Sequence, residues 1–176
     1  MSATTLNRAA SSWAEAEPCF LQKRSIDDLA GNLAETFGFA PGGDINELIH
    51  RLGGTIRYED IEGWLETESG SIEVEERGEF TIYLPNFTSH VRDRFTMAHE
   101  LGHYILHSGF GEKRIRVPRS GSNRLEWEAN WFAAAFLMPR KKFLAELDAR
   151  SSVALLAAKF DVSIEAAKVR KDSLGR

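Results

Sequence analysis

The stretch RFTMAHELGHYILH, residues 94–107, places three of the chain's five histidines at intervals of four residues. In an α-helix each residue turns by about 100°, so His99 and His103 lie about 40° apart on one face and about 6 Å apart along the axis. Glu100 lies about 60° from His103, on the flank of that face. This is the HExxH pattern, in which two histidines bind zinc and the glutamate acts as a general base.

A five-residue pattern also arises by chance, on a helix whose histidines cap the core or face solvent. Two neighbouring features favour a metal site. The surrounding residues are mostly apolar, so the helix is expected to be buried, and buried imidazoles need partners. Gly102 interrupts a good helix at a cost of about 1 kcal/mol relative to Ala, which indicates that another segment packs closely there.

The third metal ligand has to come from elsewhere in the chain. A metzincin site would need glycine at position 106 and histidine at 109, but Leu106 and Gly109 stand there, which excludes that class. A glutamate-completed site needs a carboxylate on a later helix. The segment LEWEANWFAAAFLMP, residues 125–139, offers Glu126 and Glu128.

These two glutamates point about 200° apart on a helix, so only one of them can face the metal. Glu126 shares its face with Asn130 and small residues such as Ala133, which would let the helix approach the glycine of the HExxH helix. Glu128 lies on the side of the bulky Trp131. We therefore predict Glu126 as the ligand, with Asn130 orienting a histidine. The predicted metal ligands are His99, His103 and Glu126, and the predicted catalytic residue is Glu100.

Composition limits the classes of protein that need to be considered. With 176 residues, of which 43% are hydrophobic, the chain can bury one sizeable core. A formal net charge of −4 gives no sign of a nucleic-acid or membrane-surface protein. The single cysteine, Cys19, excludes an intramolecular disulfide and suits the cytoplasm. No apolar run approaches the ~20 residues of a membrane span, and the start lacks the apolar core of a signal peptide.

Periodicity and turn residues predict the order helix, then strand, then helix. Helices are expected at 25–38 with Ser25 as cap and at 44–52 capped by Asp44, and strands at 55–61, 70–76 and 78–84. The HExxH helix is expected at about 89–107, the next at 124–138, and shorter helices at 140–150, 152–160 and 163–174. This order favours an α+β fold with helices on one side of a short sheet. We predict a poorly ordered segment at 1–24, a core at 25–139 and a helical subdomain at 140–176.

The two motifs together resemble the ImmA/IrrE family of zinc metallo-endopeptidases. The match is close over about residues 92–139 and looser through GSIEV, FTIYLPN and LAAKFDVSIEAAKVR, while residues 1–24 have no evident counterpart. Phe136 stands where leucine is common in the family. The resemblance implies a reduced zincin-like, thermolysin-type core. It also implies that the third ligand is the glutamate four residues before an Asn or Asp, which is Glu126 here.

The same resemblance implies one Zn²⁺ per chain and cleavage of a DNA-binding repressor in transcription regulation and stress response. Mn²⁺ or Co²⁺ can also occupy such sites. Neither direct nucleic-acid binding nor a membrane partner is expected. The alternative is a DNA-binding or protein-interaction regulator that uses LAAKFDVSIEAAKVR as a helix-turn-helix. Residues 140–176 carry nine Lys or Arg and five Asp or Glu, a modest excess for phosphate binding.

Secondary features have two interpretations each. His107 lies about 12 Å along the helix from His99, too far for both to bind one ion, and either contacts substrate or supports the site. The basic loop at 109–124 is either solvated or recognises an acidic peptide, and the strand at 79–84 either pairs with substrate along its edge or is an ordinary strand. The candidate stabilisers of the oxyanion are Tyr104, His107 and an arginine after Phe110. Arg92 and Arg94 are expected to anchor the start of the helix, with a substrate contact as the alternative.

Overall fold

The computed structural model describes residues 12–62, 71–117, 123–149 and 151–176. The N-terminal half holds α1 (Lys23–Thr36), α2 (Ile45–Arg51), β1 (Gly54–Glu59), β2 (Ile72–Glu76) and β3 (Glu79–Pro85). The C-terminal half holds α4 (His90–Gly102), the π-helical turn η1 (His103–His107), β4 (Ile115–Val117), α5 (Arg124–Leu137), α6 (Arg140–Asp148), α7 (Val153–Phe160) and α8 (Ile164–Ser173). This confirms the predicted α+β class.

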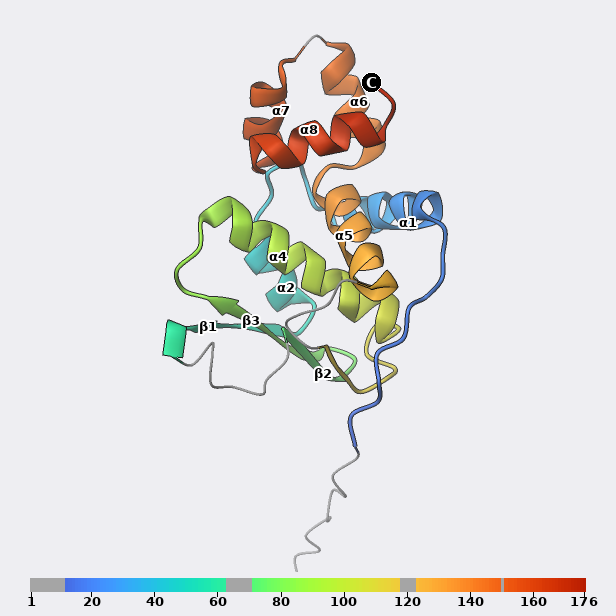
Figure 1. Cartoon of the computed structure of the whole chain (residues 1–176), viewed down its shortest axis with the longest axis vertical. Coiled ribbons are helices and arrows are strands. Elements are labelled where there is room, and N and C mark those ends of the chain that lie inside the picture. The colour runs from blue at the N-terminus through green and yellow to red at the C-terminus, as the bar shows by residue number, and fades with distance from the viewer. Residues whose placement is uncertain (1–11, 63–70, 118–122, 150) are drawn as a thin grey trace, which may run out of the picture.

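The four strands form one small mixed sheet in the order β1-β3-β2-β4. β1 pairs parallel with β3, and β2 pairs antiparallel with both β3 and β4. Figure 1 shows α2 and α4 together on one side of the sheet, with α5 crossing the end of α4. Phe80, Ile82 and Leu84 are buried on the sheet face as the alternation predicts.

The place of β3 in the sheet contradicts one hypothesis from the sequence. β3 has β1 on one side and β2 on the other, so an extended substrate cannot pair with it as an added strand. Among the described strands, β1 and β4 form the edges. Backbone pairing between distant segments decides which strand is central, and alternation within a strand does not report it.

Two predicted helix starts had different outcomes. Asp44 caps α2 as expected, because its side chain accepts hydrogen bonds from the backbone N–H groups of Asn46 and Glu47. The predicted cap at Ser25 is wrong, since α1 already begins at Lys23, and Gln22 precedes it without a side-chain cap.

The helices α4 and α5 pack closely at Gly102. A Cβ atom added to Gly102 would lie 3.2 Å from both the Cα of Ala129 and the Cβ of Phe132. That spacing is tighter than ordinary van der Waals contact, so a glycine at this position lets the second helix approach. The expectation of close packing at this glycine is confirmed.

Buried arginines attach the C-terminal helices to the rest of the chain. Arg170 on α8 donates to both carboxylate oxygens of Asp27 on α1, at 2.7 and 2.9 Å, and to the carbonyl of Met138 at 3.0 Å. Arg94 on α4 lies 3.3 Å from the carboxylate of Asp161 and donates to the carbonyl of Gly43. Arg94 therefore anchors its helix as predicted. The division at residue 140 stays a prediction.

The segment that begins at residue 12 passes α5 before it enters α1 (Figure 1), and its Ala14 forms an isolated parallel bridge with Ile115 of β4. The N–H of Ala14 donates to the carbonyl of Arg114 at 2.8 Å. The Trp13 ring stacks under the guanidinium groups of Arg114 and Arg116, whose central carbons lie 4.1 and 4.7 Å from the ring centre. Residues 1–11 of the segment predicted to be poorly ordered lie outside the described residues. Within the described part of the chain, no helix has the length and apolarity of a membrane span.

Candidate metal centre

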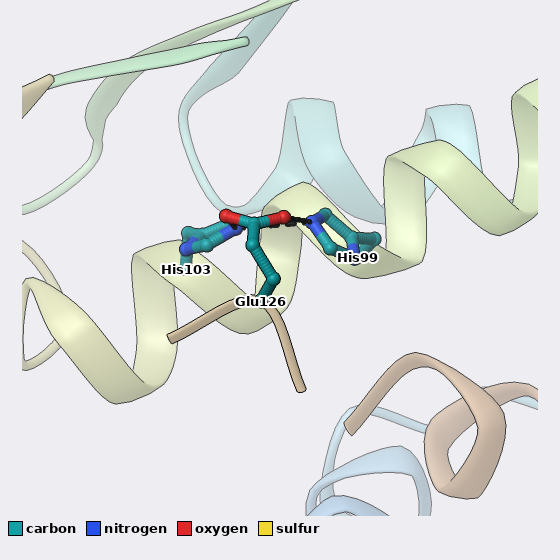
Figure 2. A group of neighbouring side chains, drawn as sticks. All are labelled: His99, His103 and Glu126. Carbon is teal, nitrogen blue, oxygen red and sulfur yellow. Dashed lines mark hydrogen bonds and ion pairs between the residues drawn. The ribbon is translucent and has the colours of Figure 1, made fainter. Parts of the chain in front are cut away.

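Three side chains from α4, η1 and α5 converge on one point (Figure 2). One ligand atom from each of His99, His103 and Glu126 lies within 4.8 Å of the other two. The two imidazole Nε2 atoms are 3.0 Å apart, and the Glu126 carboxylate oxygens lie 3.2 Å from that of His99 and 3.5 Å from that of His103. Two imidazoles and one carboxylate are a donor set that suits a zinc ion with one open position.

The N-terminal end of α5 delivers Glu126 to this point. Asn123 caps α5, and its side chain accepts a hydrogen bond from the N–H of Glu126 at 3.2 Å. Glu126 is therefore in the first turn, where the helix dipole favours a negative charge. The close approach at Gly102 brings this turn within reach of the two histidines.

Asn130 lies one turn further along α5 and contacts the far side of His99. The Nδ1 of His99 is 3.0 Å from the side-chain oxygen of Asn130. An amide oxygen only accepts, so Nδ1 donates its proton to Asn130 and Nε2 is the atom left to bind a metal. The residue that the sequence assigned to orient a histidine is thus placed to do so.

Burial and neighbouring charges set the protonation of the two histidines. Burial, together with the charges of His99 and His107, holds the pKa of His103 well below its usual value. His103 is therefore neutral at pH 7, which is the form that binds a metal. For His99, burial opposes protonation, but the hydrogen bond to Glu126 and the charge of Glu100 raise its pKa. A divalent cation in the cluster would displace that proton.

Glu100 lies beside the cluster and contributes none of its three ligand atoms. The side chain is 2% exposed, and its Oε2 accepts a hydrogen bond from the hydroxyl of Ser71 at 3.0 Å. Burial raises the pKa of Glu100 to about 7, although the charge of His99 and the Ser71 hydroxyl oppose the shift. A bound cation would favour the carboxylate form. Ser71 was missed by the sequence reasoning, because nothing near it in the sequence marks its contact across the fold.

Glu128 lies away from the cluster, in a buried polar environment. Its carboxylate accepts the backbone N–H groups of Cys19 at 2.8 Å and Phe20 at 2.9 Å, and the Nε–H of Arg124 at 2.8 Å. The Nε2 of His107 lies 3.1 Å from the same carboxylate. The sequence predicted that Glu128 faces away from the metal, but it did not reveal these partners.

The candidate oxyanion stabilisers among the described residues have other partners. The hydroxyl of Tyr104 accepts the N–H of Gly78 at 3.1 Å, and its ring stacks on Phe80 in the core. His107 is buried between His103 and Glu128. Neither side chain lines the cleft beside His99 and Glu100, so the structure gives no support to an oxyanion role for them.

Arginines of the basic loop form ion pairs that the sequence did not predict. Arg114 and Arg116 extend to Glu75 and Glu73 on β2, at 2.6 and 2.7 Å, and Arg124 pairs with Glu128. These three arginines therefore brace the sheet and α5, whereas Lys113 of the same loop is exposed. Recognition of an acidic peptide by the loop stays a prediction. Arg119 lies outside the described residues.

A cleft of about 600 Å³ opens beside His99 and Glu100. One wall comes from α4 and includes Arg92, Phe95 and Thr96. The opposite wall comes from the turn before α8 and its first helical residues, Val162, Ser163 and Ala166. The C-terminal helices thus border the space in which a substrate would meet the histidines.

Comparison with known proteins identifies a family that matches this chain and a solved structure with a similar fold. The family of IrrE N-terminal-like domains, Peptidase_M78, matches residues 50–171. A solved structure, "Mycobacterium tuberculosis transcriptional regulator", is similar over 87% of this chain, with a TM-score of 0.57 and 19% sequence identity. The match covers 48% of that chain, so this chain spans about half of its length. At this identity the likeness concerns the fold alone. No curated protein sequence matches the chain.

Proposed function

Since the chain belongs to the Peptidase_M78 family of IrrE N-terminal-like domains, we propose that it is a zinc-dependent, gluzincin-like endopeptidase with a reduced zincin-like core. The observation that carries the proposal is the convergence of His99, His103 and Glu126, with Glu100 beside them. The three ligands would hold the ion and leave one position open for water. Mn²⁺ and Co²⁺ fit the same donor set.

When bound, a zinc ion supplies a Lewis acid that polarises a peptide carbonyl and lowers the pKa of its water to about 7. The chain's own residues supply the remaining functions. Glu100 takes a proton from the attacking water and returns it to the leaving amine. The hydroxyl of Ser71 holds the Glu100 carboxylate in place, and Asn130 holds His99.

The substrate that we propose is a DNA-binding repressor cut at one or a few exposed segments. The family resemblance implies this class. The cleft supports it, because about 600 Å³ accommodates a few residues of an extended chain and no folded domain. The cytoplasmic location expected from the single cysteine belongs to the same proposal.

Incubation of the zinc-loaded protein with repressor-type proteins encoded near its gene tests the function. We expect one discrete cut in a true substrate, none after chelation of the metal, and little digestion of casein. Mass spectrometry of the fragments would locate the bond. Rapid degradation of casein at many sites would contradict the proposed specificity, and intact substrates throughout would contradict the activity.

DNA binding by the C-terminal helices is the second candidate, and we expect it to be absent or weak. In a helix-turn-helix the second helix reads the DNA, and here that would be α8. Arg170 of α8 is engaged with Asp27, and Ser163 and Ala166 border the cleft. A mobility-shift assay at physiological salt should therefore show no complex. A sub-micromolar complex with steep salt dependence would favour the regulator instead.

A further inference from the structure

We propose that His107 and Glu128 are positioning residues that hold His103 in the one tautomer and orientation that can bind the metal. The proposal rests on the proposed function of the cluster. It concerns residues outside the three ligands, and it links the N-terminal segment to the metal centre.

A continuous chain of hydrogen bonds leads away from the cluster. The Nδ1 of His103 lies 2.9 Å from the Nδ1 of His107, and the Nε2 of His107 lies 3.1 Å from the Oε2 of Glu128. The exposed fractions of the three residues are 0%, 3% and 0%. Water is thus largely excluded, and each polar atom depends on the partner that the protein provides.

The donors at the far end fix the direction of this chain. Glu128 accepts the N–H groups of Cys19 and Phe20 and the Nε–H of Arg124, all of which can only donate. An acceptor carboxylate requires the proton of His107 on Nε2, which makes its Nδ1 an acceptor. The Nδ1 of His103 must then carry a proton, and its Nε2 lone pair faces Glu126 and His99.

The contact between His103 and His107 lies within a π-helical turn. η1 covers His103–His107, and the N–H of Ser108 donates to the carbonyl of His103 five residues earlier at 3.1 Å. Within this turn the ring centroids of His103 and His107 are 4.9 Å apart, close to the 4.8 Å between His99 and His103 one turn earlier. Such turns occur often at functional sites. Here the turn supplies an outer partner to a histidine on the same helix.

The far anchor comes from a distant part of the chain. Cys19 and Phe20 precede α1 and lie 109 and 108 residues from Glu128 in sequence. Phe20 has a φ of 56°, in the left-handed region, as its backbone turns to reach the carboxylate. The N-terminal segment therefore orients the carboxylate, which orients His107 and through it His103.

Zinc affinity of matched variants tests the proposal. Loss of a group that orients a metal ligand typically weakens metal binding by about 10–100-fold. We expect that loss for His107→Leu, which removes both hydrogen bonds. His107→Gln should recover most of the affinity, because an amide can accept from His103 and donate to Glu128. Glu128→Gln should also bind more weakly, because its NH₂ group would face N–H donors.

Phe143→Leu is the control, because Phe143 is fully buried in α6 and its loss lowers stability without touching this chain of hydrogen bonds. It should leave the zinc affinity unchanged. The affinity is measured by competition with a chromophoric chelator, without substrate. The ¹⁵N chemical shifts of the zinc-loaded protein should show His103 protonated at Nδ1 and His107 at Nε2.

Wild-type affinity in both His107→Leu and Glu128→Gln, or a proton on Nδ1 of His107, would overturn the proposal. If His107→Leu does not fold, Glu128→Gln and the chemical shifts decide. These measurements do not depend on peptide cleavage. A wild-type protein that binds zinc, with variants that bind it equally well, overturns only this inference. A wild-type protein that binds no zinc overturns the proposed function as well.

Discussion

A Glu100→Gln variant is expected to bind zinc as the wild type does and to lose peptide hydrolysis by at least about 10²–10⁴-fold, the range attributed to a positioned general acid–base. Glutamine has the shape of glutamate, and its amide oxygen can still accept the hydroxyl of Ser71. It cannot take up the proton of an attacking water. The change therefore removes the proposed chemistry and leaves the ligand atoms of the cluster in place.

Two measurements on the same preparation separate these effects. Metal content after dialysis reports the site, and the rate of the discrete cut reports the chemistry. Glu79→Gln, at an exposed position of β3, makes the same chemical change away from the cleft and should retain both. Loss of zinc from the Glu100 variant would show that the carboxylate is a ligand. Full activity would place the reaction at another site.

The parts of the candidate centre that the sequence predicted depend on helical spacing. His99, His103 and Glu100 are fixed relative to one another by the helix that carries them, so residue intervals convert directly into angles. The same conversion separated Glu126 from Glu128 on a later helix. Gly102 added a further long-range prediction, since a glycine in a good helix indicates a close neighbour.

The parts that were missed depend on contacts between segments far apart in the chain. Ser71 reaches Glu100 only because β2 lies beside the helix, and Cys19 reaches Glu128 only because the N-terminal segment passes α5. The central place of β3 has the same origin. The sequence around each of these residues has no periodicity or turn signal that reports the partner, and tertiary pairing decides it.

His107 was left with two interpretations because its partner beyond the helix is distant in sequence. Helical spacing places His107 one turn after His103, but it does not report Glu128 on α5. In the structure His107 lies in the π-helical turn, between His103 and Glu128. Tyr104 of the same turn packs against Phe80 and Phe110 in the core. Helix propensity alone does not predict such a turn.

Glu126→Ala is expected to lose most of its bound zinc. Glu126 is the only anionic member of the cluster, and its carboxylate spans both histidines at 3.2 and 3.5 Å. Its removal leaves only two neutral imidazoles as ligands. A divalent ion would then be partly buried without an anionic ligand, which is unfavourable. The affinity should fall further than the about 10–100-fold expected when a ligand only loses an orienting partner.

Metal content of purified, dialysed variants measures this directly, and two other residues of α5 provide the comparison. Trp127→Ala alters a half-exposed side chain beside Glu126 and should retain zinc as the wild type does. Glu128→Ala keeps all three ligands but leaves the N–H groups of Cys19 and Phe20 unpaired, so its zinc content should lie between the other two. The expected order arises because Glu126 faces the histidines and Glu128 faces the N-terminal segment. Zinc lost from the Glu128 variant and kept in the Glu126 variant would reverse the two roles, and with them the way in which α5 packs on α4.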